Sequence, residues 1–141
     1  MPGVASYAGA NGLPQLLGGS EILVCLLPLT AETEGILNGS TLALLPKGAA
    51  LVNAARGAHL VEEDLLAALA SGQISAAVLD VFREEPLPAG HPFWRHPRVI
   101  LTPHVAAFTN PATAAPIILD NIRRFEEGRP LLNRIDPARG Y

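Results

Sequence analysis

Residues 49–56 read Ala-Ala-Leu-Val-Asn-Ala-Ala-Arg, an apolar run closed by an arginine. Two other runs follow the same pattern: residues 76–82 (AAVLDVF) precede Glu85, and residues 99–103 (VILTP) precede His104. Short continuous apolar runs predict strands that are buried on both faces, as in a parallel sheet. Ligands of open parallel sheets bind just beyond the carboxyl ends of the strands. We therefore expect Arg56, Glu85 and His104 to lie at one ligand-binding edge of the sheet.

The rest of the chain alternates predicted strands with predicted helices. We predict strands over residues 21–27, 49–55, 74–81 and 98–102. We predict helices over residues 13–17, 30–38, 61–70 and 109–127, the last containing Pro116, at which it starts late or bends. Alternation of this kind predicts an α/β fold with right-handed crossovers.

Composition narrows the class of protein. The 141 residues are 49% hydrophobic and 16% charged, which is typical of one folded domain. The formal net charge is −3 and no basic block exceeds the pair Arg123-Arg124, which argues against a nucleic-acid partner. The apolar run over 22–29 is too short to span a bilayer and no signal peptide is visible, so we expect no membrane association and a cytoplasmic location.

Cysteine and histidine usage gives no sign of a disulfide framework or a metal site. The single cysteine, Cys25, lies inside an apolar run and is predicted to be a buried, inert thiol. His59, His91 and His96 lack metal-ligand spacing with one another or with Cys25, and we predict that they are solvated loop residues.

The three strand-end residues have complementary chemistry. The guanidinium of Arg56 can bind a carboxylate through two parallel hydrogen bonds, and Glu85 beside His104 favours the imidazolium, a general acid suited to neutral pH. An acid next to a bound carboxylate can protonate the adjacent carbonyl, as in the reduction of a 2-oxo acid. The hydride then comes from a cofactor, usually a nicotinamide. Taken singly, a glutamate or a histidine in such a position is more often a loop acid or a structural residue, and it is their pairing that favours catalysis. The second interpretation of Arg56 is a surface arginine that caps its strand.

Three other residues near the strand ends have expected roles, and two of them have a second interpretation. Asp80 either holds the carboxamide or ribose of a cofactor or caps its loop. Gly57 would let the backbone approach a ligand closely. Trp94 is expected to pack the long loop onto the body of the protein, with a role in a substrate pocket as the second interpretation.

Four ordered motifs resemble the D-isomer-specific 2-hydroxyacid dehydrogenase family. They are residues 26–30 (LLPLT) with 34–38 (EGILN), 51–57 (LVNAARG), 79–82 (LDVF) with 84–87 (EEPL), and 101–107 (LTPHVAA). Residues 104–107 (HVAA) and the closing residues 139–141 (RGY) look like the glyoxylate/hydroxypyruvate reductase A branch of that family.

The resemblance implies an NAD(P)H-dependent reductase of small 2-oxo acids such as glyoxylate and hydroxypyruvate. It implies that Arg56 grips the substrate carboxylate, that His104 donates the proton, and that Glu85 is the partner of His104. It further implies NADP or NAD as cofactor, a homodimer or higher oligomer, and a cofactor pocket lined by Leu27, Pro28, Ala54, Arg56, Asp80 and His104.

One family motif has no counterpart in the sequence. The Gly-rich phosphate loop G-x-G-x-x-G does not occur, and Gly18-Gly19 lacks its spacing. The resemblance therefore implies a partial Rossmann-like parallel sheet with flanking helices that lacks the first βαβ unit. Residues 1–110 would be the C-terminal part of the NAD(P)-binding domain, and residues 111–141 a helix and tail that join an absent substrate domain.

Two expectations follow for the chain by itself. We expect weak or absent dinucleotide binding, and association through the apolar edge of the strand over 21–27. The alternative to an enzyme is a non-catalytic oligomerising or binding module derived from the same fold.

Overall fold

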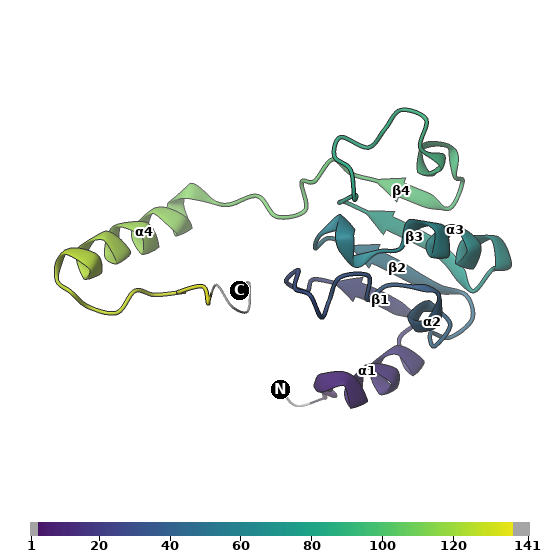
Figure 1. The fold of residues 1–141 in the computed structure, drawn as a ribbon, viewed down its shortest axis with the longest axis horizontal. Helices are drawn as coiled ribbons and strands as arrows, with labels where there is room; N and C mark the ends of the chain where they lie inside the picture. Colours follow the sequence, from purple (N-terminus) through teal and green to yellow (C-terminus); the bar gives the residue numbers. More distant parts are fainter. Residues whose placement is uncertain (1–2, 137–141) are drawn as a thin grey trace. The chain divides into compact units, whose positions relative to one another are not determined.

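The computed structural model describes residues 3–136 of the chain. The chain forms two compact units, a first that ends at His104 and a second that starts at Val105 (Figure 1). The first unit contains a sheet with strands in the order β1-β2-β3-β4, every neighbouring pair parallel. Its elements are α1 (Gly9–Gly18), β1 (Ile22–Cys25), α2 (Gly39–Leu42), β2 (Ala49–Asn53), α3 (Glu62–Ser71), β3 (Ile74–Leu79) and β4 (Val99–Leu101), with short 3₁₀ helices at Gly57–His59 and Pro92–Arg95. The predicted α/β fold is confirmed.

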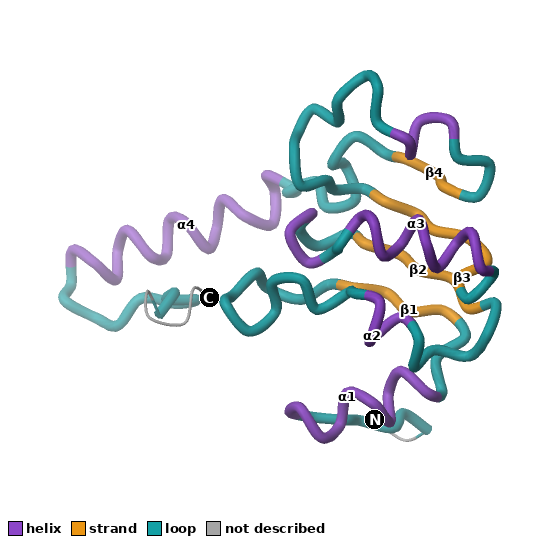
Figure 2. The backbone as a smooth tube through the Cα atoms, turned by 45° about the vertical axis from the view of Figure 1, so that its right-hand side comes forward, coloured by secondary structure: helices purple, strands orange, loops and turns teal. Residues whose placement is uncertain are grey.

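The sheet buries one face more completely than the other. Leu51 and Leu79 are fully buried on the face that α3 covers (Figure 2), whereas Ile22, Val24 and Ile100 on the opposite face are 66%, 51% and 61% exposed. The expectation that both faces would be buried was therefore wrong for the residues that the structure describes. The physical reason is that α2 and α3 pack together and lie on the same face of the sheet.

The helix predicted over residues 30–38 was wrong. The segment forms turns, and the four-residue helix α2 begins immediately after it. Gly35 adopts the left-handed region (φ 62°), which ends helical geometry, and its N–H donates to the carbonyl of Ala58. Asn38 then caps α2: its Oδ1 accepts the N–H of Thr41 at 3.2 Å, and the Thr41 hydroxyl accepts the N–H of Asn38 at 2.9 Å.

The other helices lie close to their predicted positions. Helix α1 is longer than predicted, and α3 is shifted by one residue and followed by Gly72 at φ 74°. In the second unit, α4 (Pro111–Glu126) begins near its predicted start and runs through Pro116. Asn110 caps α4 by accepting the N–H of Ala112 at 3.0 Å.

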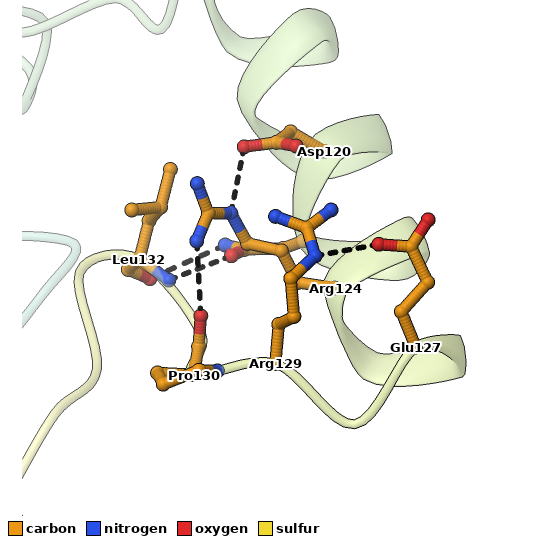
Figure 3. Close-up of polar contacts among 7 residues, drawn as sticks. Asp120, Arg124, Glu127, Arg129, Pro130 and Leu132 are labelled. Atoms are coloured by element: carbon orange, nitrogen blue, oxygen red, sulfur yellow. Dashed lines mark hydrogen bonds and ion pairs between the residues drawn. The ribbon is translucent and has the colours of Figure 1, made fainter.

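The segment that follows α4 is hydrogen-bonded back to the helix (Figure 3). Leu132 N–H donates to Asn121 Oδ1 at 2.8 Å, and Asn121 Nδ2 donates to the Leu132 carbonyl at 3.2 Å. Arg124 contacts both Asp120 (2.8 Å) and the Pro130 carbonyl (3.3 Å). The RGY motif at 139–141 lies outside the described residues.

Cys25 is 4% exposed, and burial raises the pKa of its thiol, in agreement with the inert role predicted for it. Within residues 3–136, none of the helices is both long enough and apolar enough to cross a membrane.

Candidate active site

Backbone hydrogen bonds beyond the strand ends bring the loops of the carboxyl edge together. Ala54 N–H donates to the carbonyl of Cys25 (3.3 Å), Asp80 N–H to that of Asn53 (3.0 Å), and His104 N–H to that of Asp80 (2.8 Å). Because all four strands are parallel, these loops leave the same edge of the sheet. The strand-end residues therefore gather at one edge, as their positions in the sequence predict.

Glu85 and His104 face each other across the loops that follow β3 and β4. Glu85 Oε2 lies 2.9 Å from His104 Nδ1, and Glu85 Oε1 accepts the N–H of Phe82 at 2.9 Å. The hydrogen bond with His104, followed by that from Phe82, holds the pKa of the Glu85 carboxyl below its usual value. Glu85 is therefore an ionised carboxylate at neutral pH, fixed through both oxygens.

The contact with Glu85 determines which nitrogen of the His104 imidazole is available to a ligand. An ionised carboxylate only accepts hydrogen bonds, so His104 Nδ1 carries a proton and Nε2 is left for a ligand. The His104 side chain is 48% exposed, so a ligand can reach it. The residue also adopts the left-handed region (φ 53°), a conformation that non-glycine residues rarely adopt and that concentrates at functional sites.

Arg56 lies at the same edge, but its side chain is directed to its own strand end. Its Nη1 donates to the carbonyl of Ala55 at 2.7 Å, and the residue is exposed. Its backbone N–H donates to Nδ1 of His59 at 3.2 Å. The structure thus brings Glu85 and His104 into contact and leaves the Arg56 guanidinium accessible to an anion.

Asp80 is 4% exposed and belongs to the loop framework. Its Oδ1 accepts the hydroxyl of Thr102 at 2.5 Å, and its carbonyl accepts the His104 N–H. These contacts correspond to the loop-capping interpretation. A role for Asp80 toward a cofactor stays a prediction.

The remaining predicted cofactor residues follow β1 and β2. Leu27 is 42% exposed, Pro28 is exposed, and Ala54 is half-buried. The carbonyl of Pro28 accepts hydrogen bonds from the Thr33 hydroxyl (2.7 Å) and from Nε2 of His59 (3.2 Å). The loop after β1 therefore presents apolar side chains to solvent, while the side chains of Thr33 and His59 bind the carbonyl of Pro28.

A pocket of about 620 Å³ adjoins the Glu85–His104 pair. Its walls are largely apolar and include Phe82, Glu85, Leu87, Trp94, Thr102 and His104. Trp94 is 55% exposed, and its Nε1 donates to the Pro88 carbonyl at 2.9 Å. The indole therefore packs on its own loop and lines this pocket, which favours the second of its two interpretations.

Gly57 makes a close backbone contact within the protein itself. A Cβ placed on it would lie 1.9 Å from the backbone carbon and 2.0 Å from the oxygen of Phe82. A close approach that requires glycine is thus made to the loop after β3. This packing connects the Arg56 loop to the loop that carries Glu85. An approach of this backbone to a ligand stays a prediction.

The prediction of three solvated histidines was wrong for His59 and His91. His59 is fully buried. His91 lies 3.3 Å from Glu62, both side chains being only 18% exposed. Both residues are held by segments that are distant in the sequence, His59 by Pro28 and His91 by Glu62. Among residues 3–136, no three His, Cys, Asp or Glu side chains are grouped so as to hold a metal ion.

Comparison with known proteins identifies the family. Residues 4–106 match the NAD binding domain of the D-isomer specific 2-hydroxyacid dehydrogenases, a span that includes Arg56, Glu85 and His104. The chain belongs to the D-isomer specific 2-hydroxyacid dehydrogenase family. The resemblance found in its motifs is thereby confirmed.

The relatives of this family member include bacterial reductases. The chain is 52% identical over 139 residues to glyoxylate/hydroxypyruvate reductase A of Yersinia enterocolitica, a match that covers 99% of this chain and 44% of the relative. It is 51% identical to the enzyme of the same name from Salmonella newport, covering 45% of that protein. The chain thus spans less than half the length of the curated relatives it matches.

Solved structures of the family have the same fold. A D-isomer specific 2-hydroxyacid dehydrogenase from Xanthobacter autotrophicus, in complex with NADPH and MES, aligns with a TM-score of 0.96 at 52% identity, covering 100% of this chain and 58% of that one. An NADPH-dependent glyoxylate/hydroxypyruvate reductase from Sinorhizobium meliloti, in complex with NADP and sulfate, aligns with a TM-score of 0.88 at 41% identity, covering 95% and 44%.

Proposed function

We propose that this chain carries the acid–base and carboxylate-binding groups of an NAD(P)H-dependent reductase of small 2-oxo acids, with glyoxylate and hydroxypyruvate as substrates. The observation that carries the proposal is the 2.9 Å contact between Glu85 and His104 at the carboxyl edge of the sheet. The names of the Yersinia and Salmonella relatives support the choice of substrates.

The proposed roles follow from the chemistry of each side chain. Arg56 binds the substrate carboxylate through two parallel hydrogen bonds. His104 gives the proton on Nε2 to the 2-oxo oxygen, and the Glu85 carboxylate stabilises the imidazolium before the transfer and orients the ring throughout. An acid held in place in this way contributes roughly 10²–10⁴-fold to the rate.

The residues at the strand ends are compatible with a dinucleotide at this edge. Leu27 offers an exposed apolar surface to a ring, and Pro28 and Ala54 follow the neighbouring strands. In the proposal these three residues, with Arg56, Asp80 and His104, line the cofactor pocket. A bound NADPH or NADH supplies the hydride for the reduction.

The wider setting belongs to the same proposal. Residues 1–110 form part of an NAD(P)-binding domain, residues 111–141 join a substrate domain, the protein works in the cytoplasm, and its partner is a second copy. The uncovered sheet face, with Ile22 and Val24 on the outermost strand, supports self-association. It also favours the alternative function, a non-catalytic oligomerising module.

A chimera tests the proposed function directly. In the Yersinia reductase, the segment that matches this chain is replaced by residues 1–141, and NADPH oxidation is followed with glyoxylate and hydroxypyruvate. We expect activity, an increase in KM for the 2-oxo acid in Arg56→Ala, and a fall in kcat of about 10²-fold or more in His104→Ala. A chimera that folds and binds NADPH but reduces neither acid refutes the proposed enzyme and favours the non-catalytic module.

A further inference from the structure

His59 is a buried titratable side chain that the proposed mechanism does not use. It is fully buried, and both ring nitrogens have backbone partners. Nδ1 lies 3.2 Å from the N–H of Arg56, and Nε2 lies 3.2 Å from the carbonyl of Pro28, 31 positions away in the sequence. One imidazole therefore connects the loop after β1 to the loop after β2.

The partners select one tautomer of this ring. The Pro28 carbonyl can only accept, so Nε2 must carry a proton to avoid facing it with a lone pair. The Arg56 carbonyl also lies 3.0 Å from Nδ1, but it already accepts the backbone N–H of His59 (3.2 Å) and Nδ2 of Asn53 (3.2 Å). The Arg56 N–H can only donate, so Nδ1 accepts from it and carries no proton, and the 3.0 Å approach of the Arg56 carbonyl is then a close contact and not a hydrogen bond.

We propose that His59, with a proton on Nε2 and none on Nδ1, is a positioning residue that holds Arg56 and Pro28 at a fixed separation. The inference rests on the proposed function, in which Arg56 binds the substrate carboxylate and Pro28 lines the cofactor pocket. The Nδ1 bond orients the backbone from which the guanidinium extends. The Nε2 bond holds the carbonyl of Pro28, which lines the proposed cofactor pocket.

Two substitutions separate the two bonds. In His59→Asn, the side-chain oxygen takes the place of Nδ1 and keeps the bond from Arg56, while the bond to Pro28 is lost. In His59→Gln, the side-chain amide takes the place of Nε2 and keeps the bond to Pro28, while the bond from Arg56 is lost. His96→Gln is the matched control, because His96 Nδ1 also accepts a local N–H, that of Arg98 at 3.2 Å, but is outside the proposed site.

The first measurement uses the 141-residue chain and needs no activity. Nitrogen NMR of the imidazole is expected to show Nε2 protonated and Nδ1 unprotonated at neutral pH. Amide exchange at Arg56 is expected to rise about tenfold in His59→Gln and to stay near the wild-type rate in His59→Asn. A proton on Nδ1, or equal exchange in the two variants, overturns the proposal.

The second measurement is kinetic and uses the chimera described above. We expect the KM for glyoxylate to rise about tenfold in His59→Gln and the KM for NADPH to rise about tenfold in His59→Asn, with kcat changed less than about twofold in either. A purely structural histidine would instead lower stability and move both KM values together in both variants, which overturns the proposal. If the unmutated chimera folds and binds NADPH but is inactive, the proposed function fails, and the NMR result alone decides whether His59 holds the two loops.

Discussion

Gly57→Ala tests the packing that joins the Arg56 loop to the Glu85 loop. The added Cβ would lie 1.9 Å from the backbone carbon of Phe82 and 2.4 Å from the nitrogen of Arg83, whereas ordinary contact begins at 3.4 Å. The two backbones must therefore separate by about 1.5 Å, and no side chain can rotate away to avoid this. Overpacking of this severity costs about 3 kcal/mol of unfolding free energy, or about 10 °C in melting temperature for a chain of this size.

The same displacement is expected to reach the proposed catalytic pair. The N–H of Phe82 holds Oε1 of Glu85, so moving Phe82 disturbs the carboxylate that orients His104. Denaturant unfolding monitored by circular dichroism measures the loss of stability. Gly90→Ala is the matched control, because a Cβ on Gly90 meets nothing within 4 Å, and we expect a change within about 0.5 kcal/mol. A Gly57→Ala protein as stable as this control would refute the argument from close approach.

Three other predictions follow from individual contacts. Because the pKa of Glu85 is lower in the folded protein than in the unfolded chain, the unfolding free energy falls as the pH drops below about 4.5. Glu85→Gln should remove this contribution, so that its melting temperature falls less steeply with decreasing pH. Equal slopes in the two proteins contradict the ion pair with His104. Val24→Lys on the uncovered sheet face should reduce self-association measured by sedimentation, whereas Leu44→Lys, at a site of similar exposure, should not; equal effects count against that face. Asn38→Ala removes the cap of α2 and should cost about 1 kcal/mol in denaturant unfolding, and an unchanged midpoint argues against the cap.

The strands were predictable because their signals are local. Apolar runs such as residues 49–53 and 74–79 need no information from elsewhere in the chain to be recognised as strands. The gathering of Arg56, Asp80 and His104 at one edge then follows from parallel pairing, which βα alternation implies. The error at residues 30–38 has an equally local origin: acidic residues near a threonine resemble a helix start, but Gly35 at φ 62° ends any helix there.

The candidate site was only partly predictable. The sequence analysis pairs Glu85 with His104, and the structure brings Glu85 to 2.9 Å from His104. The roles of Arg56, Glu85 and His104 in catalysis stay predictions. No local pattern in the sequence predicted the burial of His59. A histidine three residues after the arginine that ends a strand is expected to lie in a loop.

By itself, the sequence determined the α/β class, the strand positions and the family, because apolar periodicity and short motifs are properties of contiguous residues. Only the tertiary structure decided which residues connect the loops at the carboxyl edge of the sheet. Gly57 packs against the backbone of Phe82, and His59 binds the carbonyl of Pro28, 31 residues away. Contacts of this kind depend on how separate βα units pack against one another, so neither neighbouring residues nor propensities encode them. The sequence alone predicted neither the packing of Gly57 nor the burial of His59.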